Sequence, residues 1–224
     1  MRWSEAILAF YDALPCRWSP PNGVEVIFPF DDPEVRRVMR LFFTKYYDDE
    51  NPRTLLLGIN PGRFGAGVTG IGFTDPVLLE TVCGIPNTLP RSHELSAEFI
   101  CEVVEAYGGA KRFYGDFFVT TVLPFGLLRN GKNYNYYDDK ATYDYFLPFI
   151  VDALTQQMRL PHARRRVGVI GKGKNVKVLT SLNAAYGWFD AMEVLPHPRW
   201  VMQYRRKEKS RFIELYLTTL EQLQ

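Results

Sequence analysis

The sequence predicts an α/β protein, a three-layer α/β/α sandwich around a mostly parallel four-stranded sheet. Short, almost entirely apolar segments alternate with segments of helical period, and glycine-rich or polar residues follow each apolar segment. Strands that are apolar along their whole length fit a parallel sheet covered by helices on both faces. A length of 224 residues suits one such unit, so a single domain over residues 1–224 is expected.

The first part of the chain is expected to contribute two helices and one short strand. Arg2–Leu14 has the spacing of an amphipathic helix, and Val24–Phe28 is a short β-rich segment. Asp32 and Pro33 precede a second segment of helical period, Glu34–Tyr47. Asp32 is therefore predicted to cap this helix, with Pro33 in its first turn.

The middle of the chain contains two of the predicted sheet strands. Thr54–Ile59 is a continuous apolar run, and Asp116–Leu123 is rich in phenylalanine, valine and threonine. The glycine-rich segment Arg63–Asp75 is expected to be irregular. A helix is predicted over Ser96–Tyr107, with Ser96 as its cap and the two following glycines ending it.

The last part of the chain is expected to complete the sheet and its helical layers. Asp138–Met158 reads as a long helix that Pro148 should bend. The two remaining strands are predicted at Val167–Ile170 and Glu193–Leu195. Two further helices are expected, at Val176–Tyr186 and Gln203–Leu223.

Four segments that carry polar or turn residues come directly after the predicted strands. They are Asn60, Leu123-Pro124-Phe125, Gly171–Asn175 and His197. In open parallel sheets, ligands bind beyond the carboxyl ends of the strands. The sequence therefore predicts one site at this edge of the sheet.

The composition is that of a water-soluble globular protein, with 46% hydrophobic and 23% charged residues. The three cysteines, Cys16, Cys83 and Cys101, are scattered and form no paired motif, which indicates buried free thiols. No metal or other cofactor is expected. Acidic residues interrupt Met1–Leu14, and no apolar run approaches the ~20 residues of a membrane span. An intracellular, bacterial cytoplasmic protein without a membrane partner is predicted.

The net charge of +2 conceals an asymmetry along the chain. Residues 164–211 contain 12 lysines and arginines against 3 acidic residues, whereas the remainder contains 15 against 22. This distribution predicts a localised basic face, of the kind that binds nucleic acid. The alternative is an ordinary solvated surface.

The first predicted sheet strand ends within a motif that resembles one of a known protein family. Leu57–Gly62 reads LGINPG and is followed in order by Phe64-Gly65, Thr69–Ile71 and Phe73. This ordered set resembles the uracil-DNA glycosylase superfamily, in particular the single-strand-selective monofunctional type and its bacterial relatives.

Later segments extend the resemblance, which runs from about Leu41 to Glu214. Phe118–Leu127 is similar to the family's middle strand and turn, and Asn130–Asn133 to the loop that follows it. Val167–Lys172 resembles the strand and loop that contact the DNA backbone. His197-Pro198 matches the start of the second catalytic motif, which is shorter here and lacks its second proline.

The resemblance implies a monofunctional DNA glycosylase of base excision repair. Such an enzyme flips uracil out of DNA and removes it by hydrolysis, and hypoxanthine and xanthine are further candidate substrates here. The expected partner is single- or double-stranded DNA, and a monomer is expected. No lysine occupies a motif position from which it could form a Schiff base with the sugar, in keeping with a monofunctional enzyme.

Two residues match the catalytic positions of the family. Asn60 stands where the family orients the attacking water. Its side-chain carbonyl can accept a hydrogen bond from that water. His197 stands where the family donates a hydrogen bond to O2 of the departing base, a form of anion stabilisation. The alternatives are that Asn60 only stabilises a turn and that His197 is structural.

Four further residues match base-binding positions. The resemblance implies that the Ile59 N–H faces the base, that Gly62 lets the backbone approach it, and that the base stacks on Phe73. Simple core filling is the alternative for Phe73. Thr121 stands where the family has a base-reading asparagine. Its hydroxyl can donate or accept, so broader recognition than strict uracil specificity is expected.

The remaining candidates would contact DNA. Arg199 and Trp200 could fill the gap left by a flipped base, and Lys172 and Lys174 could bind phosphates together with backbone N–H groups. Several basic residues then follow on a predicted helix, for which a solvated face is the alternative. The DNA-binding candidates are Arg63, Lys172, Gly173, Lys174, Pro198, Arg199, Trp200, Arg205 and Arg206.

Two rival functions follow from the same residues. Gly168–Asn175 nearly spells a nucleotide-binding P-loop, but Asn175 replaces the Mg²⁺-binding hydroxyl and Gly168 lies inside the apolar strand. A non-catalytic nucleic-acid-binding protein on the same fold is the other alternative. The presence of both Asn60 and His197 favours the enzyme.

Overall fold

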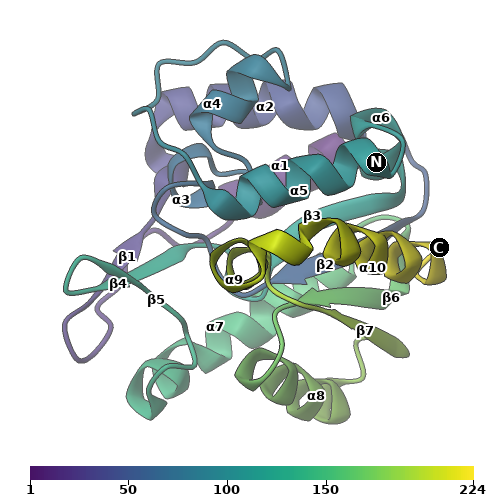
Figure 1. Cartoon of the computed structure of the whole chain (residues 1–224). Coiled ribbons are helices and arrows are strands. Elements are labelled where there is room, and N and C mark those ends of the chain that lie inside the picture. The colour runs from purple at the N-terminus through teal and green to yellow at the C-terminus, as the bar shows by residue number, and fades with distance from the viewer.

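The computed structural model describes all residues, 1–224, and places a parallel sheet between layers of helices (Figure 1). In Figure 1, α7 and α8 lie below the sheet, and α1, α2 and α5 lie above it. In chain order the elements are α1 (Trp3–Asp12), β1 (Val24–Ile27), η1 (Pro29–Asp31), α2 (Pro33–Tyr47), β2 (Arg53–Gly58), α3 (Ala66–Thr69), α4 (Pro76–Thr81), α5 (Leu95–Ala106), α6 (Ala110–Asp116), β3 (Phe117–Thr121), β4 (Gly126–Arg129), β5 (Lys132–Tyr134), α7 (Lys140–Met158), β6 (Ala163–Ile170), α8 (Lys174–Tyr186), β7 (Ala191–Leu195), α9 (Pro198–Tyr204), η2 (Arg206–Glu208) and α10 (Lys209–Gln222).

The central sheet has the strand order β3-β2-β6-β7, and every neighbouring pair is parallel. The predicted three-layer fold class is therefore confirmed. Gly58 pairs with Thr121 and Ile170 pairs with Leu195, so all four strands end at the same edge. The segments that carry Asn60, Thr121, Gly171 and His197 consequently meet there.

The buried strands explain why the apolar runs fold as a sheet. Every residue of β2 and β3 is buried, as expected for central strands covered on both faces. Gly168 lies inside β6, where an added Cβ would come 2.5 Å from Leu56 Cδ2. It therefore serves close packing within the sheet.

Most predicted helices are present, and three predicted features are wrong. One is the burial of all three cysteines, since Cys16 is exposed and Cys101 is only partly buried. Asp32 caps α2 as expected and accepts hydrogen bonds from the backbone N–H groups of Glu34 and Val35. Ser96 does not cap α5, because the helix begins at Leu95 and Ser96 is buried within it. Glu94 is the N-cap residue of α5, and its backbone N–H donates a hydrogen bond to the Asp75 carboxylate at 3.0 Å.

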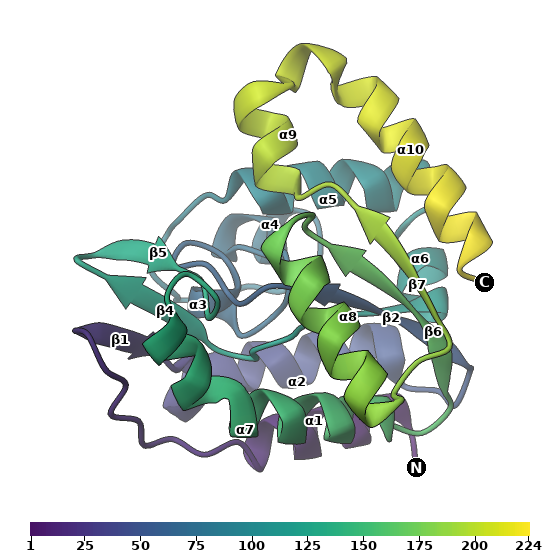
Figure 2. The ribbon, with the colours of Figure 1, turned by 90° about the horizontal axis from the view of Figure 1, so that it is seen from below.

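The predicted helix over Gln203–Leu223 is interrupted. The chain leaves α9 at Arg205, passes through η2, and enters α10 at Lys209, so that α9 and α10 meet at an angle (Figure 2). The turn lets α10 fold back against the body of the protein and bury Tyr216 and Leu220. The basic residues from Arg205 onward therefore do not lie on one continuous helix, contrary to the expectation from sequence.

A second, three-stranded antiparallel sheet with order β1-β4-β5 lies beside the main one. Asn130 and Gly131 join β4 to β5, with φ angles of 51° and 68°. This geometry fits a two-residue hairpin turn, which Asn-Gly favours. The glycine-rich segment 63–75 is largely irregular, as predicted, apart from the single turn α3. None of the helices has the length and apolarity needed to cross a bilayer.

Candidate active site

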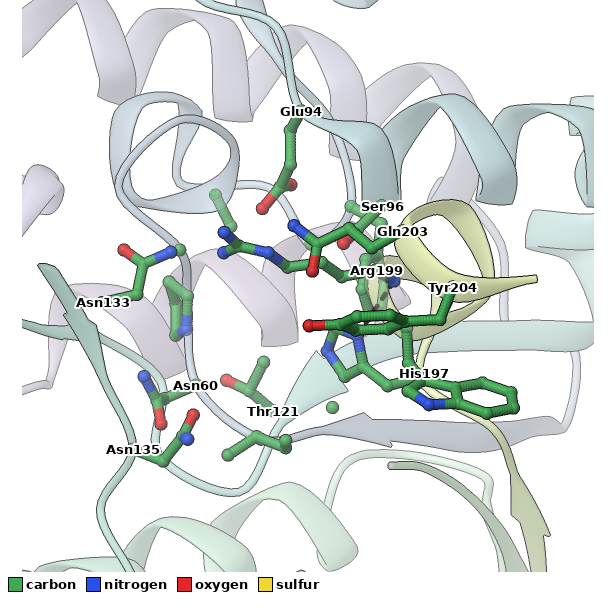
Figure 3. Close-up of a pocket in the computed structure, with 18 residues that line it drawn as sticks. Asn60, Glu94, Ser96, Thr121, Asn133, Asn135, His197, Arg199, Gln203 and Tyr204 are labelled. Atoms are coloured by element: carbon green, nitrogen blue, oxygen red, sulfur yellow. Dashed lines mark hydrogen bonds between the residues drawn. The ribbon is translucent and has the colours of Figure 1, made fainter. Parts of the chain in front are cut away.

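A cavity of about 320 Å³ opens at the carboxyl edge of the sheet (Figure 3). Its walls come from the β2–α3 segment, the end of β3, the start of α5, strand β5 and helix α9. It is lined by Gly58, Ile59, Asn60, Pro61, Gly62, Ala66, Gly72, Phe73, Glu94, Ser96, Thr121, Asn133, Asn135, His197, Arg199, Trp200, Gln203 and Tyr204. Segments far apart in the chain thus form one pocket. Of the four segments predicted to meet here, those of Asn60 and His197 line it, whereas Leu123-Pro124-Phe125 is buried and Gly171–Asn175 lies outside the lining.

Asn60 is held with its carbonyl oxygen free. Its Nδ2 donates to the backbone carbonyl of Tyr134 at 3.1 Å, which fixes the orientation of the amide. Its Oδ1 is buried and has no hydrogen-bond partner. A buried acceptor without a partner is energetically unfavourable, and such groups concentrate at functional sites. This oxygen can accept a hydrogen bond from a water molecule or a ligand.

His197 is a neutral hydrogen-bond donor. Its Nδ1 accepts from the backbone N–H of Arg199 at 3.1 Å, so the ring proton belongs on Nε2. Burial and, to a lesser extent, the positive charge of Arg199 together lower the pKa of His197 to about 4. At neutral pH the imidazole therefore carries no charge and retains one N–H for a ligand.

Phe73 adopts an unusual backbone conformation beside His197. Its φ is 50°, in the left-handed region that non-glycine residues rarely occupy. The ring centroids of Phe73 and His197 are 6.1 Å apart, with the rings edge to face. Gly58 lies beside both side chains, and a Cβ there would crowd the Thr121 methyl carbon at 3.2 Å while making ordinary contact with Phe73 Cζ at 3.6 Å.

Thr121 presents a hydroxyl with a fixed direction. Its Oγ1 donates to the backbone carbonyl of Leu123 at 2.7 Å. The hydroxyl proton is therefore engaged, and only the oxygen lone pairs remain for a ligand. Its backbone carbonyl accepts from Gln157 Nε2 at 3.2 Å, which anchors this end of β3.

Glu94 places a carboxyl group in the pocket that the sequence did not mark as functional. Its Oε1 lies 2.8 Å from where a Cβ on Gly62 would stand, and its Oε2 lies 2.0 Å from the corresponding point on Gly65. Burial and the nearby charge of Asp75 raise the pKa of Glu94 to about 7, against the opposing charge of Arg199. No motif surrounds Glu94, so only the fold could reveal it.

The pocket mouth is formed by α9 and the β4–β5 hairpin. Trp200 is 41% exposed and Tyr204 is 66% exposed. From the hairpin side, Asn133 accepts from the backbone N–H of Arg63 at 3.1 Å through its Oδ1. Sequence reasoning missed Asn135 and Tyr204 as lining residues, together with Asn133 and Gln203, although Asn133 lies in a motif that carried the family resemblance.

Eight predicted site residues line the pocket, and seven lie outside it. Those inside are Ile59, Asn60, Gly62, Phe73, Thr121, His197, Arg199 and Trp200. Those outside are Arg63, Lys172, Gly173, Lys174, Pro198, Arg205 and Arg206. The exposed Lys172–Lys174 segment begins directly after Gly171, where an added Cβ would lie 3.8 Å from His197 Cδ2.

Several of the basic residues outside the pocket are paired. Arg206 lies 3.4 Å from Glu98, Lys209 lies 2.7 Å from Glu102, and Arg205 lies 3.6 Å from Glu208. The guanidinium of Arg205 also lies over the Trp200 ring, 5.5 Å from its centroid. These pairs reduce the free positive charge of the segment after α9. Lys172 and Lys174 make no ion pair.

Comparison with known protein families identifies the class of protein to which this fold and pocket belong. The sequence profile of the Uracil DNA glycosylase superfamily matches residues 44–221. The chain belongs to this superfamily and is a DNA glycosylase, a hydrolase of N-glycosidic bonds that acts on DNA in base excision repair.

A particular solved structure is similar over the full length. The crystal structure of wild-type SMUG2 from Pedobacter heparinus superimposes with a TM-score of 0.94 at 36% sequence identity. The alignment covers 100% of this chain and 98% of that one. No curated protein matches the sequence. The similarity supports uracil-DNA glycosylase activity for this chain.

Proposed function

We propose that this DNA glycosylase binds a flipped uracil or deaminated purine in the pocket and uses Asn60 and His197 to hydrolyse its glycosidic bond. The observation that supports this most directly is the pairing of a free, buried Asn60 Oδ1 with a neutral His197 N–H in one cavity. The first can orient a nucleophile and the second can stabilise a leaving group.

Asn60 positions the attacking water. The glycosidic bond of a deoxynucleotide breaks toward an oxocarbenium ion on the sugar, which needs a correctly placed water more than a strong base. Since Nδ2 of Asn60 is held by the Tyr134 carbonyl, Oδ1 can accept a hydrogen bond from that water without rotating away. Such preorganisation lowers the entropic cost of the reaction.

His197 stabilises the departing uracil. As the bond breaks, negative charge accumulates on the base and in particular on O2. A preorganised donor aimed at such an oxygen typically contributes about 3–4 kcal/mol to the transition state. The hydrogen bond from Arg199 N to Nδ1 keeps Nε2–H as this donor.

Phe73 and Thr121 hold and read the base. An aromatic ring beside His197 offers a stacking surface that accepts any base. Because the Thr121 proton is donated to Leu123, its oxygen accepts a hydrogen bond from the base. Uracil N3–H and hypoxanthine N1–H match an acceptor, whereas the unprotonated ring nitrogens of cytosine and adenine do not. Ile59 and Gly62 complete this wall of the pocket.

The exposed residues around the mouth bind DNA. Arg199 and Trp200, following Pro198 on α9, fill the space vacated by the flipped base. Lys172, Gly173 and Lys174 contact phosphate groups beside them. Arg63, Arg205 and Arg206 add weaker contacts, because each already has an intramolecular partner.

The test is release of free base from a defined oligonucleotide that contains one uracil, in the presence of a chelator. Time-dependent release without metal or nucleotide is the expected result. A non-catalytic binding protein would retain the oligonucleotide without releasing base, and a nucleotide hydrolase would need Mg²⁺ and nucleotide; either behaviour would contradict the proposal.

A further inference from the structure

The pocket contains a carboxyl group for which uracil hydrolysis has no use. Glu94 lines the cavity and points into it from the side opposite Thr121 (Figure 3). It forms neither a hydrogen bond nor an ion pair through its carboxyl group, although it stands at the N-terminus of α5. A structural role as a helix cap or an ion-pair partner is therefore not fulfilled.

The position of Glu94 follows from the neighbouring backbone. Gly62 and Gly65 have no side chains, and the carboxyl oxygens occupy the space that a Cβ on either would need. Ser92 holds the same segment against the glycine-rich loop, because its hydroxyl donates to the Phe64 carbonyl at 2.7 Å. The carboxyl group is thus set into the wall that continues from Asn60 to Gly62.

The edge of the base that faces this wall can be deduced from the other contacts. With O2 of a pyrimidine at His197 and its pairing edge at Thr121, the remaining edge is C5–C6, which turns toward Gly62 and Glu94. In a purine bound the same way, this edge carries N7. A cavity of about 320 Å³ has room for the larger base. Uracil offers only C–H groups to Glu94, whereas a purine offers an acceptor.

Building on the glycosylase function proposed above, we propose that the Glu94 carboxylic acid protonates N7 of a deaminated purine as its glycosidic bond breaks. The bonding pair of the C1′–N9 bond stays on the base, and the proton from Glu94 neutralises it. The water held by Asn60 adds to C1′ and releases one proton to solvent. Solvent then returns a proton to the Glu94 carboxylate, which completes the cycle.

The electrostatic surroundings keep this acid protonated at the pH where it acts. Desolvation and the Asp75 carboxylate raise the pKa of Glu94 to about 7, and the Arg199 guanidinium opposes them. His93 faces Asp75 at 3.5 Å, and His197 is the other titratable group of the cavity wall. Because the pKa is raised, the acid form is present below about pH 7 and is lost above it.

The experiment compares hypoxanthine and uracil release from otherwise identical oligonucleotides across a range of pH. For the wild type, hypoxanthine release should fall about tenfold per pH unit above about 7, with no matching fall for uracil. Glu94→Gln should lower hypoxanthine release about a hundredfold more than uracil release and should abolish that pH dependence. The matched control is Glu105→Gln, a carboxylate at the exposed far end of α5.

Two results would overturn the inference. If the rates of hypoxanthine and uracil release by the wild-type enzyme depend on pH in the same way, then no acid specifically protonates the purine. This result does not depend on whether the Glu94→Gln variant is stable. Uracil release without any hypoxanthine release would do the same while leaving the proposed uracil activity intact. Failure of the wild type to release either base would instead contradict the proposed function itself.

Discussion

The inner pocket and the rim of this protein are built on different principles. The inner pocket, defined by Asn60, Phe73, Thr121 and His197, is largely shielded from solvent, and its polar side chains are oriented by the backbone. The rim, defined by Arg199, Trp200, Gln203 and Tyr204, stands mostly on the exposed face of α9. The inner residues have one available geometry each, whereas the rim residues can adapt.

This difference indicates how the two regions act on DNA. A preorganised donor or acceptor in a shielded site contributes to the transition state, because it need not reorganise during the reaction. Exposed charges and aromatic rings contribute mainly to binding and are weakened by salt. Changes in the inner pocket should therefore affect the rate of base release, and changes at exposed positions should affect affinity.

The largest effects are expected from the two proposed catalytic residues. Asn60→Ala removes the acceptor that orients water, and His197→Ala removes the donor to O2. Each should lower the single-turnover rate of uracil release by a hundredfold or more, corresponding to about 3 kcal/mol. Binding of a uracil oligonucleotide should change little. Asn51→Ala, an exposed asparagine at the opposite end of β2, serves as the control. A near-normal rate in either pocket variant would exclude that residue from the mechanism.

The next largest effect should be the change in base preference caused by substitution of Thr121. Thr121→Asn replaces the hydroxyl with a larger amide, which can satisfy both N3–H and O4 of uracil but leaves less room for a purine. The ratio of uracil to hypoxanthine or xanthine release should rise by an amount equivalent to about 1–3 kcal/mol. The measurement is release of each base in the same sequence context by wild type and variant. An unchanged ratio would show that Thr121 does not govern the substrate range.

The pH dependence of uracil release tests the neutral state of His197. Its pKa is lowered to about 4, so the imidazole should remain uncharged as pH falls from about 8 to about 5, and the rate should stay nearly constant. Below about 4, protonation of Nδ1 breaks the hydrogen bond from Arg199 N, and the rate should fall. A decline centred near the ordinary histidine pKa of about 6.5 would contradict this assignment.

The free energy of unfolding should also depend on the titration of His197. His197 binds its proton more weakly in the folded than in the unfolded protein, so the free energy of unfolding should decrease as pH falls from about 6.5 toward 4. The slope from this group alone is at most about 1.4 kcal/mol per pH unit. The comparison is chemical denaturation of wild type and His197→Gln. Identical slopes in the two proteins would indicate that His197 is not held neutral by the fold.

The smallest effects, on DNA affinity, should come from substitutions of the exposed basic residues. These substitutions distinguish basic side chains that are free from those that already form ion pairs. Lys172→Ala and Lys174→Ala should each reduce the slope of log affinity against log salt by about one unit if each contacts one phosphate. Arg206→Ala and Lys209→Ala should reduce it less, because Glu98 and Glu102 already neutralise those groups. Equal reductions in all four variants would mean that DNA displaces the intramolecular ion pairs.

The sequence by itself determined the sheet and the position of its functional edge. Apolar runs define strands that must be covered on both faces, and parallel strands necessarily end together. Asn60 and His197 could therefore be placed at one site before any contact was known, whereas Thr121 was assigned to it only by the family resemblance. Local motifs also specified the cap of α2 at Asp32, since capping depends only on adjacent residues.

Only the tertiary structure decided what depends on partners distant in the chain. Glu94 enters the pocket because a loop after α4 folds over the glycines that follow β2, and no local pattern encodes that contact. The direction of the Thr121 hydroxyl and the pairing of Arg206 with Glu98 likewise depend on where other segments come to rest. Burial and electrostatic environment are sums over such neighbours, so the raised pKa of Glu94 and the lowered pKa of His197 are properties of the fold.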